Sequence, residues 1–299
     1  MRDTNKSLLF VAITVFSWST VATAFKIALR DFSHYELLLV ATSTALIVFA
    51  AVITLQSNWH LVAGITKKQW LSYALTGFLN PFFYYLVLFK SYDLLPAQLA
   101  QPINYFWPIL LTIMLAVFTH QHIAGVKFIG MIISFAGVVL ISLGPGSISG
   151  EDVSIAGLLL AFFSAFIWAG FWIMNKKNPQ TDNTVNLFAS FLFGLIYLLI
   201  GALFVDLNLD SAKGMQASIW SGLFEMAIPF LFFGMALRKT SNPVLINQLC
   251  YLSPFLSLFF IHFILKEKIF ITTLIGLLLI IAGVIFNEYI AKKQSPSRS

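Results

Sequence analysis

Side chains that could bind a polar solute lie along one face of the predicted helix 97–117. They are, in chain order, Gln98, Gln101, Asn104, Tyr105 and Pro108. Residues three and four apart share a face of an α-helix. A polar stripe is costly in apolar surroundings, so we expect it to face the interior of a helix bundle or a wet cavity. The alternative is that these amides only join neighbouring helices, by hydrogen bonds of about 1 kcal/mol each.

A second stripe of the same kind follows in the predicted helix 244–265. It consists of Asn247, Gln248, Tyr251 and Pro254. Polar groups that hold two particular helices together have no reason to recur at a matching place in another part of the chain. The recurrence therefore favours a cavity lining, with both stripes as candidate substrate-binding groups.

Glu225 is the one carboxylate that we place deep inside an apolar segment, the predicted helix 217–237. An acid at such a depth is by default a functional hypothesis. It could take up a proton or bind the ammonium group of a substrate; the alternative is a protonated acid that donates one structural hydrogen bond. The Asn80-Pro81 pair lies at mid-depth of helix 70–90, and Pro229 interrupts helix 217–237. Each proline removes a backbone hydrogen bond and leaves a carbonyl to find another partner, so the alternatives are a substrate contact and an ordinary kink.

Several aromatic side chains lie inside the apolar segments. Trp18 and Trp107 are too deep for an interfacial belt, and Trp168 and Trp172, four positions apart, share a face of the predicted helix 154–174. Tyr84 joins them, with Tyr105 and Tyr251 from the two stripes. Together they could line an aromatic cavity that stacks on rings or holds a cation. The alternative for each of them alone is plain packing.

The segments that carry these residues are long and apolar. The 299 residues are 59% hydrophobic and 10% charged, with a mean hydropathy of +0.87, whereas about a quarter of the residues of a soluble domain are charged. About 20 apolar residues span a bilayer. On that scale the predicted spans are 8–29, 35–55, 70–90, 97–117, 123–142, 154–174, 186–205, 217–237, 244–265 and 269–290. This pattern predicts an all-α membrane protein with ten transmembrane helices and no soluble domain.

The distribution of basic residues orients these helices, because Lys and Arg favour cytoplasmic segments. With the N-terminus inside, twelve fall on the cytoplasmic side: Arg2, Lys6, Lys67, Lys68, Lys127, Lys176, Lys177, Arg238, Lys239, Lys292, Lys293 and Arg298. Five fall outside: Arg30, Lys90, Lys213, Lys266 and Lys268. We therefore expect both termini in the cytoplasm.

Residues 94–140 match residues 240–286 without a gap at a distance of 146 positions, so that Tyr105 aligns with Tyr251 and Gly130 with Gly276. Each copy belongs to a half of five predicted helices, and an odd number makes the second half enter the bilayer from the opposite side. We predict a first repeat over 1–142, a linker over 143–153, a second repeat over 154–290 and a cytoplasmic tail over 291–299. Inverted halves around a site at the membrane midplane are typical of transporters.

Inversion also suggests a pair of gates. Gln101 lies near the outer end of its helix and Asn247 near the inner end of its own. Amides at opposite ends of a pathway are what two alternating gates would present, and this is a hypothesis. The paired glycines Gly130 with Gly137 and Gly276 with Gly283 are seven apart, so they predict close packing of helices 123–142 and 269–290.

Other classes of protein find little support. The chain has no HExxH, no GxSxG, no paired intramembrane aspartates and no phosphate-binding loop, so we expect no enzyme, no catalytic residue and no cofactor. Its single cysteine, Cys250, excludes an internal disulfide and a cysteine-based metal site. The basic residues are scattered, which argues against nucleic acid. No charged ring or filter sequence indicates a channel.

With these features the chain resembles the drug/metabolite transporter superfamily, in its EamA family. The resemblance rests on the layout of five plus five helices, on Ser17-Trp18-Ser19-Thr20, on Ile167-Trp168 and on the ending Leu265-Lys266-Glu267, Gly276, Ala282-Gly283-Val284. Gln121 departs from it, because the first half often has an acid there. The resemblance implies the EamA fold and a secondary transporter.

Two motifs, Asn104-Tyr105-Phe106-Trp107-Pro108 and Phe166-Ile167-Trp168-Ala169, look like those of YddG-type aromatic amino acid exporters. That resemblance implies ten helices around a central cavity in a bacterial inner membrane, and export of amino acids, aromatic ones favoured, by alternating access. The alternative is an exporter of cationic drugs or other metabolites. The expected partners are a small-molecule substrate and the lipid bilayer, and we expect a monomer with a homodimer as the alternative.

Overall fold

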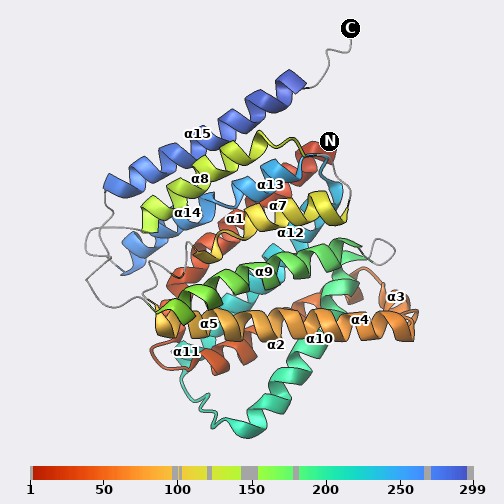
Figure 1. Ribbon diagram of the computed structural model, residues 1–299. Coiled ribbons are helices and arrows are strands. Elements are labelled where there is room, and N and C mark those ends of the chain that lie inside the picture. Colours follow the sequence, from red (N-terminus) through yellow and green to blue (C-terminus); the bar gives the residue numbers. More distant parts are fainter. Residues whose placement is uncertain are drawn as a thin grey trace.

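The computed structural model describes residues 3–95, 100, 103–119, 123–142, 154–177, 182–265 and 271–294, and every element in these ranges is helical (Figure 1). The predicted linker 143–153 lies outside the described residues, so the proposed division into two repeats stays a prediction.

The helices of the first part of the chain end before the linker. They are α1 (Asp3–Ala28), α2 (His34–Leu55), α3 (Trp59–Ala63), α4 (Lys67–Gly77), the π-helical η1 (Phe78–Phe83), α5 (Tyr84–Leu94), α7 (Trp107–Phe118) and α8 (Lys127–Ser142). Polar residues cap the starts of two of these helices. Ser33 precedes α2 and forms a capping box with Glu36, and Thr66 precedes α4 and forms a capping box with Gln69.

The helices of the second part follow the linker. They are α9 (Ile155–Lys177), α10 (Asn183–Gly201), the 3₁₀ turn η2 (Ala202–Phe204), α11 (Ala212–Ser221), the π-helical η3 (Gly222–Ala227), α12 (Ile228–Lys239), α13 (Pro243–Leu249), α14 (Leu252–Phe260), the π-helical η4 (Ile261–Leu265) and α15 (Ile271–Gln294).

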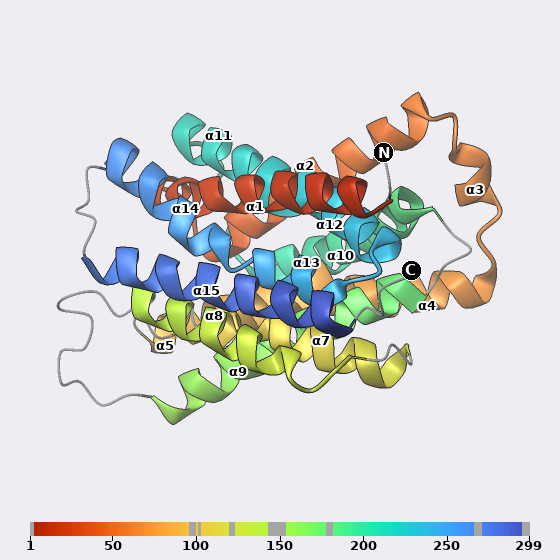
Figure 2. The ribbon, with the colours of Figure 1, turned by 90° about the horizontal axis from the view of Figure 1, so that it is seen from above.

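Within the described residues, seven helices are long and apolar enough to cross a membrane. They cover Asn5–Ala28, His34–Leu55, Lys67–Tyr92, Ile155–Lys176, Asn183–Phe204, Ala212–Lys239 and Pro243–Ile264. Three shorter apolar helices, Trp107–Phe118, Lys127–Ile141 and Leu274–Ile290, overlap the other three predicted spans. The prediction of an all-helical, multi-pass membrane protein is confirmed. The start of α1 and the end of α15 lie toward the same end of the bundle (Figure 2).

Several contacts between a helix of the first part of the chain and one of the second have counterparts made by the equivalent helices of the opposite parts. α1 packs on α12 and α14, while α9 packs on α5 and α7. In the same way α2 packs on α11 and η3, while α10 packs on α4 and η1. The π-helical segments also correspond, because η1 and η3 each interrupt the third long helix of their part of the chain. In two further contacts, α2 with α10 and α8 with α15, each helix packs on its own equivalent from the other part of the chain.

α8 and α15 lie side by side at one edge of the bundle (Figures 1 and 2). A Cβ atom added at Gly137 would lie 2.4 Å from the carbonyl oxygen of Gly276, and one added at Gly130 would lie 2.7 Å from that of Gly283. No side chain fits at such distances. The prediction that these glycines allow close packing is therefore confirmed, and α8 and α15 form a tightly packed pair at the edge of the bundle.

Candidate functional site

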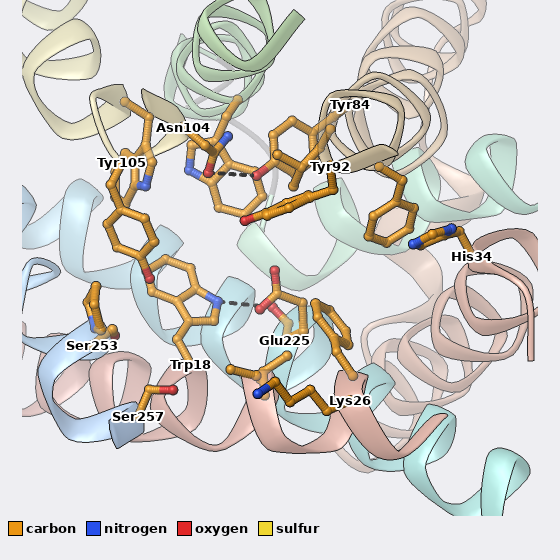
Figure 3. A pocket seen from close by; sticks show the side chains of 18 of the residues that line it. Trp18, Lys26, His34, Tyr84, Tyr92, Asn104, Tyr105, Glu225, Ser253 and Ser257 are labelled. Carbon is orange, nitrogen blue, oxygen red and sulfur yellow. Dashed lines mark hydrogen bonds between the residues drawn. The ribbon is translucent and has the colours of Figure 1, made fainter. Parts of the chain in front are cut away.

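A cavity of about 530 Å³ lies between the helices (Figure 3). Its walls come from α1, the start of α2, α5, the segment 103–106, α7, α8, α9, η3 and α14. Seven of the predicted site residues line it: Trp18, Tyr84, Asn104, Tyr105, Trp107, Trp168 and Glu225. Helices from both parts of the chain therefore build one chamber.

The cavity has an exposed end and a buried end. Lys26 and Leu29, at the C-terminal end of α1, are exposed to solvent and line it. Trp107 and Trp168 also line it but are 4% and 3% exposed. The chamber therefore opens toward the end of the bundle where α1 finishes, which is the end away from the N-terminus (Figure 2).

Three tryptophans form the floor of the chamber. The ring centroids of Trp18 and Trp107 are 6.0 Å apart, those of Trp18 and Trp168 are 5.9 Å apart, and those of Trp107 and Trp168 are 6.0 Å apart. The Trp18–Trp107 pair is edge-to-face, with an angle of 78° between the ring planes. The other two pairs are tilted, at 58° and 59°. We call these three residues the tryptophan floor.

More aromatic rings close the bundle behind the tryptophan floor. Phe233 contacts Trp18 and Trp107 at centroid distances of 5.6 Å each, and Phe230 contacts Trp168 at 5.2 Å. Trp172, predicted to line the site, packs here against Phe233 at 4.8 Å and is 1% exposed. It therefore supports the floor from below rather than lining the chamber.

Glu225 is half-buried, and Figure 3 shows its carboxylate within the chamber, near Tyr92. The hydroxyl of Tyr85 donates a hydrogen bond to Oε1 of Glu225 at 2.9 Å. The indole N–H of Trp18 donates to the backbone carbonyl of Glu225 at 3.1 Å. That carbonyl lies four positions before Pro229, which has no N–H to offer it. Trp18 thus supplies the hydrogen-bond donor that Pro229 cannot provide, which is the replacement that the sequence led us to expect.

Asn104 joins two neighbouring helices beside the floor. Its Oδ1 accepts a hydrogen bond from the Tyr84 hydroxyl at 3.4 Å, and its Nδ2 donates to Oγ of Ser164 at 2.9 Å. Asn104 lines the cavity, and its amide is also hydrogen-bonded to other side chains. Both alternatives given for this stripe, a cavity lining and a link between helices, therefore apply to Asn104.

Three other predicted site residues lie away from the chamber, among helices α7, α8, α13 and α15. Asn247 donates from Nδ2 to Oγ1 of Thr112 at 2.9 Å. Gln248 donates to the carbonyl of Gly130 at 2.8 Å and to Ser134 at 2.6 Å, and its Oε1 accepts from Asn287 at 2.7 Å.

The third of these residues, Tyr251, is fully buried against Val138, Ile141 and Ile280. The polar members of the second stripe thus hold helices together in this structure, and only Pro254 of that stripe lines the chamber. Their role in binding substrate stays a prediction.

Asn80 and the two glutamines complete the predicted set. Asn80 is fully buried in η1, next to Pro81, which packs on Gly194 of α10. Within the described part of the chain neither side-chain atom of Asn80 has a hydrogen-bond partner. Gln98 and Gln101, and with Gln101 the predicted pair of gates, lie outside the described residues.

Sequence reasoning missed much of the chamber wall. His34, Phe89, Tyr92, Ser253 and Ser257 line it without having been selected, and so do residues of α1 beyond Trp18. A signal was present in α1: the wall residues are Trp18, Val21, Ala22, Phe25, Lys26 and Leu29, which recur every three or four positions. Periodicity shows that these residues share a face, but it does not say whether that face meets lipid, a neighbouring helix or a cavity.

The fold and the chamber define a class of protein: a multi-pass helical membrane protein with a cavity between its helices. The EamA-like transporter family matches residues 5–143 and again residues 155–289, so the chain belongs to that family. The predicted EamA resemblance is confirmed, and this family is one of transporters rather than enzymes.

The chain is also similar to individual proteins. The protein of Bacillus subtilis (strain 168) named "Uncharacterized transporter YvbV" is 26% identical over 232 residues, which cover 76% of this chain and 75% of that protein. A solved crystal structure superimposes with a TM-score of 0.84 at 18% identity and covers 99% of this chain and 100% of the other. At that identity the structure supports the fold alone.

Proposed function

We propose that the protein exports small organic metabolites by alternating access, and that its substrates are amino acids, with aromatic side chains favoured. The observation that carries this proposal is the tryptophan floor inside a chamber of about 530 Å³. Small-molecule sites have volumes of roughly 300–1,000 Å³ and combine aromatic walls with a few polar groups. Here the polar groups include Lys26, His34, Asn104, Glu225, Ser253, Ser257 and the phenols.

The proposed transport cycle uses ten membrane spans in two inverted halves. Support comes from the two successive matches to the EamA-like family and from the packing pairs that exchange between the two parts of the chain. Support also comes from the π-helical segments at corresponding places. Two such halves can rock about a shared midplane site, which exposes the site to one side at a time.

We further propose that the protein is a monomer in a bacterial inner membrane with both termini in the cytoplasm. The chamber opens at the end of α1 away from the N-terminus. Under this orientation the structure is an outward-facing state, and the tryptophan floor and the rings behind it separate the chamber from the cytoplasm. A substrate must then pass the floor when the inner side opens.

Counterflow tests the proposal. Purified protein in vesicles loaded with unlabelled tryptophan is expected to accumulate external labelled tryptophan transiently, because a carrier exchanges the two. Trp168→Ala removes one ring of the floor and is expected to slow exchange of tryptophan more than exchange of leucine. The exposed Trp59→Ala, far from the chamber, is the matched control. Absence of counterflow for every amino acid of a panel would reject amino acids as the substrates.

Export of cationic drugs is a second candidate, and the presence of Glu225 in an aromatic chamber favours it. The two functions separate in growth assays. Cells that overexpress the protein are expected to resist toxic analogues of aromatic amino acids, whereas resistance to quaternary ammonium compounds alone would favour the drug exporter.

A further inference from the structure

We infer that the carboxylate of Glu225 is the binding site for a protonated amine, so that the substrate presents an ammonium group at the edge of the tryptophan floor. This inference rests on the proposed function in one respect, namely that small molecules enter this chamber. It adds the chemical group by which they are recognised.

The first argument is the geometry of the carboxylate. Tyr85, which is 1% exposed, fixes Oε1 from the buried side at 2.9 Å. The described residues provide no hydrogen bond or ion pair to Oε2, although Glu225 is accessible from the chamber. A carboxylate accepts several hydrogen bonds, and those from charged donors are the strong ones. The group is therefore held in one orientation, with accepting capacity left for a ligand.

The second argument is the set of side chains around it. Trp18, Tyr92 and Lys26 lie next to Glu225 in Figure 3, Tyr105 lies beyond Trp18, and all of them line the same chamber. Aromatic faces attract an ammonium group, and the attraction grows when water is excluded. The carboxylate and the aromatic faces beside it both attract a cationic amine.

The third argument concerns the rest of the ligand. Trp18 is hydrogen-bonded to the Glu225 carbonyl and is itself one ring of the tryptophan floor. An amine bound at Glu225 therefore lies beside the floor, and an aromatic ring joined to that amine by a short linker can stack there. Tryptamine and the aromatic amino acids have this form.

The test compares two ligands that differ in the amine. Tryptamine and 3-methylindole share the ring, and calorimetry with the purified full-length protein gives both affinities. The intact protein is expected to prefer tryptamine by at least about tenfold, the size expected for a hydrogen bond to a charged group. Glu225→Gln is expected to remove this preference and leave the affinity for 3-methylindole unchanged. Asp206→Asn removes the same charge at an exposed site and is expected to change neither.

A second variant guards against misfolding. Tyr85→Phe keeps the buried ring but frees Oε1, so tryptamine is expected to bind a few-fold more weakly while 3-methylindole binds as before. An unchanged preference for tryptamine in Glu225→Gln overturns the inference, as does equal binding of the two ligands to the intact protein. Counterflow separates this inference from the proposed function. Amine binding without amino acid exchange rejects only the proposed function. Exchange that survives Glu225→Gln undiminished rejects only the role of Glu225 in binding the amine.

Discussion

The indole N–H of Trp18 lies 3.1 Å from the backbone carbonyl oxygen of Glu225, to which it donates a hydrogen bond across 207 positions of the chain. The bond joins α1 to η3, and the two helices come from different parts of the chain. It also ties a ring of the tryptophan floor to the backbone of the acid. Any movement that separates these parts of the chain has to break or move this contact.

Removal of this one bond is expected to slow transport. Trp18→Phe keeps an aromatic ring in the floor but leaves the Glu225 carbonyl without its donor, at a cost of about 0.5–1.5 kcal/mol. A two- to tenfold lower counterflow rate is expected. Trp220→Phe is the matched control, because Trp220 donates a similar bond to Thr20 at 3.1 Å but does not line the chamber. Equal effects of the two variants would show that the Trp18 bond has no special role.

The contact of α8 with α15 should be sensitive to a single methyl group. Gly137→Ala places a Cβ atom where it would lie 2.4 Å from the Gly276 carbonyl, so the helices must move apart. Destabilisation by about 1–3 kcal/mol is expected for such overpacking, measured as a lower melting temperature in detergent. Gly170→Ala in α9 meets no atom within 4 Å and should keep or slightly raise the melting temperature. A stable Gly137→Ala variant would mean that the two helices are not tightly apposed in the membrane.

Labelling of introduced cysteines should report the open side of the chamber. Ala22→Cys lies on the chamber wall, whereas Phe233→Cys lies behind the floor. A membrane-impermeant maleimide added outside intact cells is expected to label the first and spare the second. Saturating substrate should lower labelling at position 22 by this external reagent and raise labelling at position 233 by a membrane-permeant maleimide. Background is low, because the native Cys250 is fully buried. Parallel changes at the two positions would contradict alternating access.

Gln248 should matter for stability more than for substrate affinity. Its amide makes three hydrogen bonds, to Gly130, Ser134 and Asn287, and thereby links α13 to α8 and α15. Gln248→Leu is expected to cost about 1–3 kcal/mol and to leave the KM for transport unchanged. The exposed Gln216→Leu on α11 serves as control. A raised KM at an unchanged melting temperature would instead make Gln248 a substrate-binding residue, as the stripe in the sequence predicts.

Much of the chamber could be predicted because depth and residue type carry physical meaning in a membrane. Trp18 and Trp107 lie too deep for an interfacial belt, Trp168 shares a helix face with Trp172, and Glu225 is an acid in an apolar segment. Apart from Trp172, all of these line the cavity. The carbonyl left open by Pro229 was likewise expected, because proline cannot donate a hydrogen bond in any fold. What no local rule could supply was its partner, Trp18, since that contact joins residues 207 positions apart.

Tyr105 and Tyr251 show where the sequence by itself stops. They align in the 146-residue repeat and occupy matching polar stripes, so the sequence determined that each lies in an apolar segment, although the structure places both in turns between helices. Only the tertiary structure decided their surroundings: Tyr105 lines the chamber, whereas Tyr251 is sealed against α8 and α15. Helical periodicity fixes which residues share a face, but the helix packed opposite fixes whether that face meets a cavity or a neighbour.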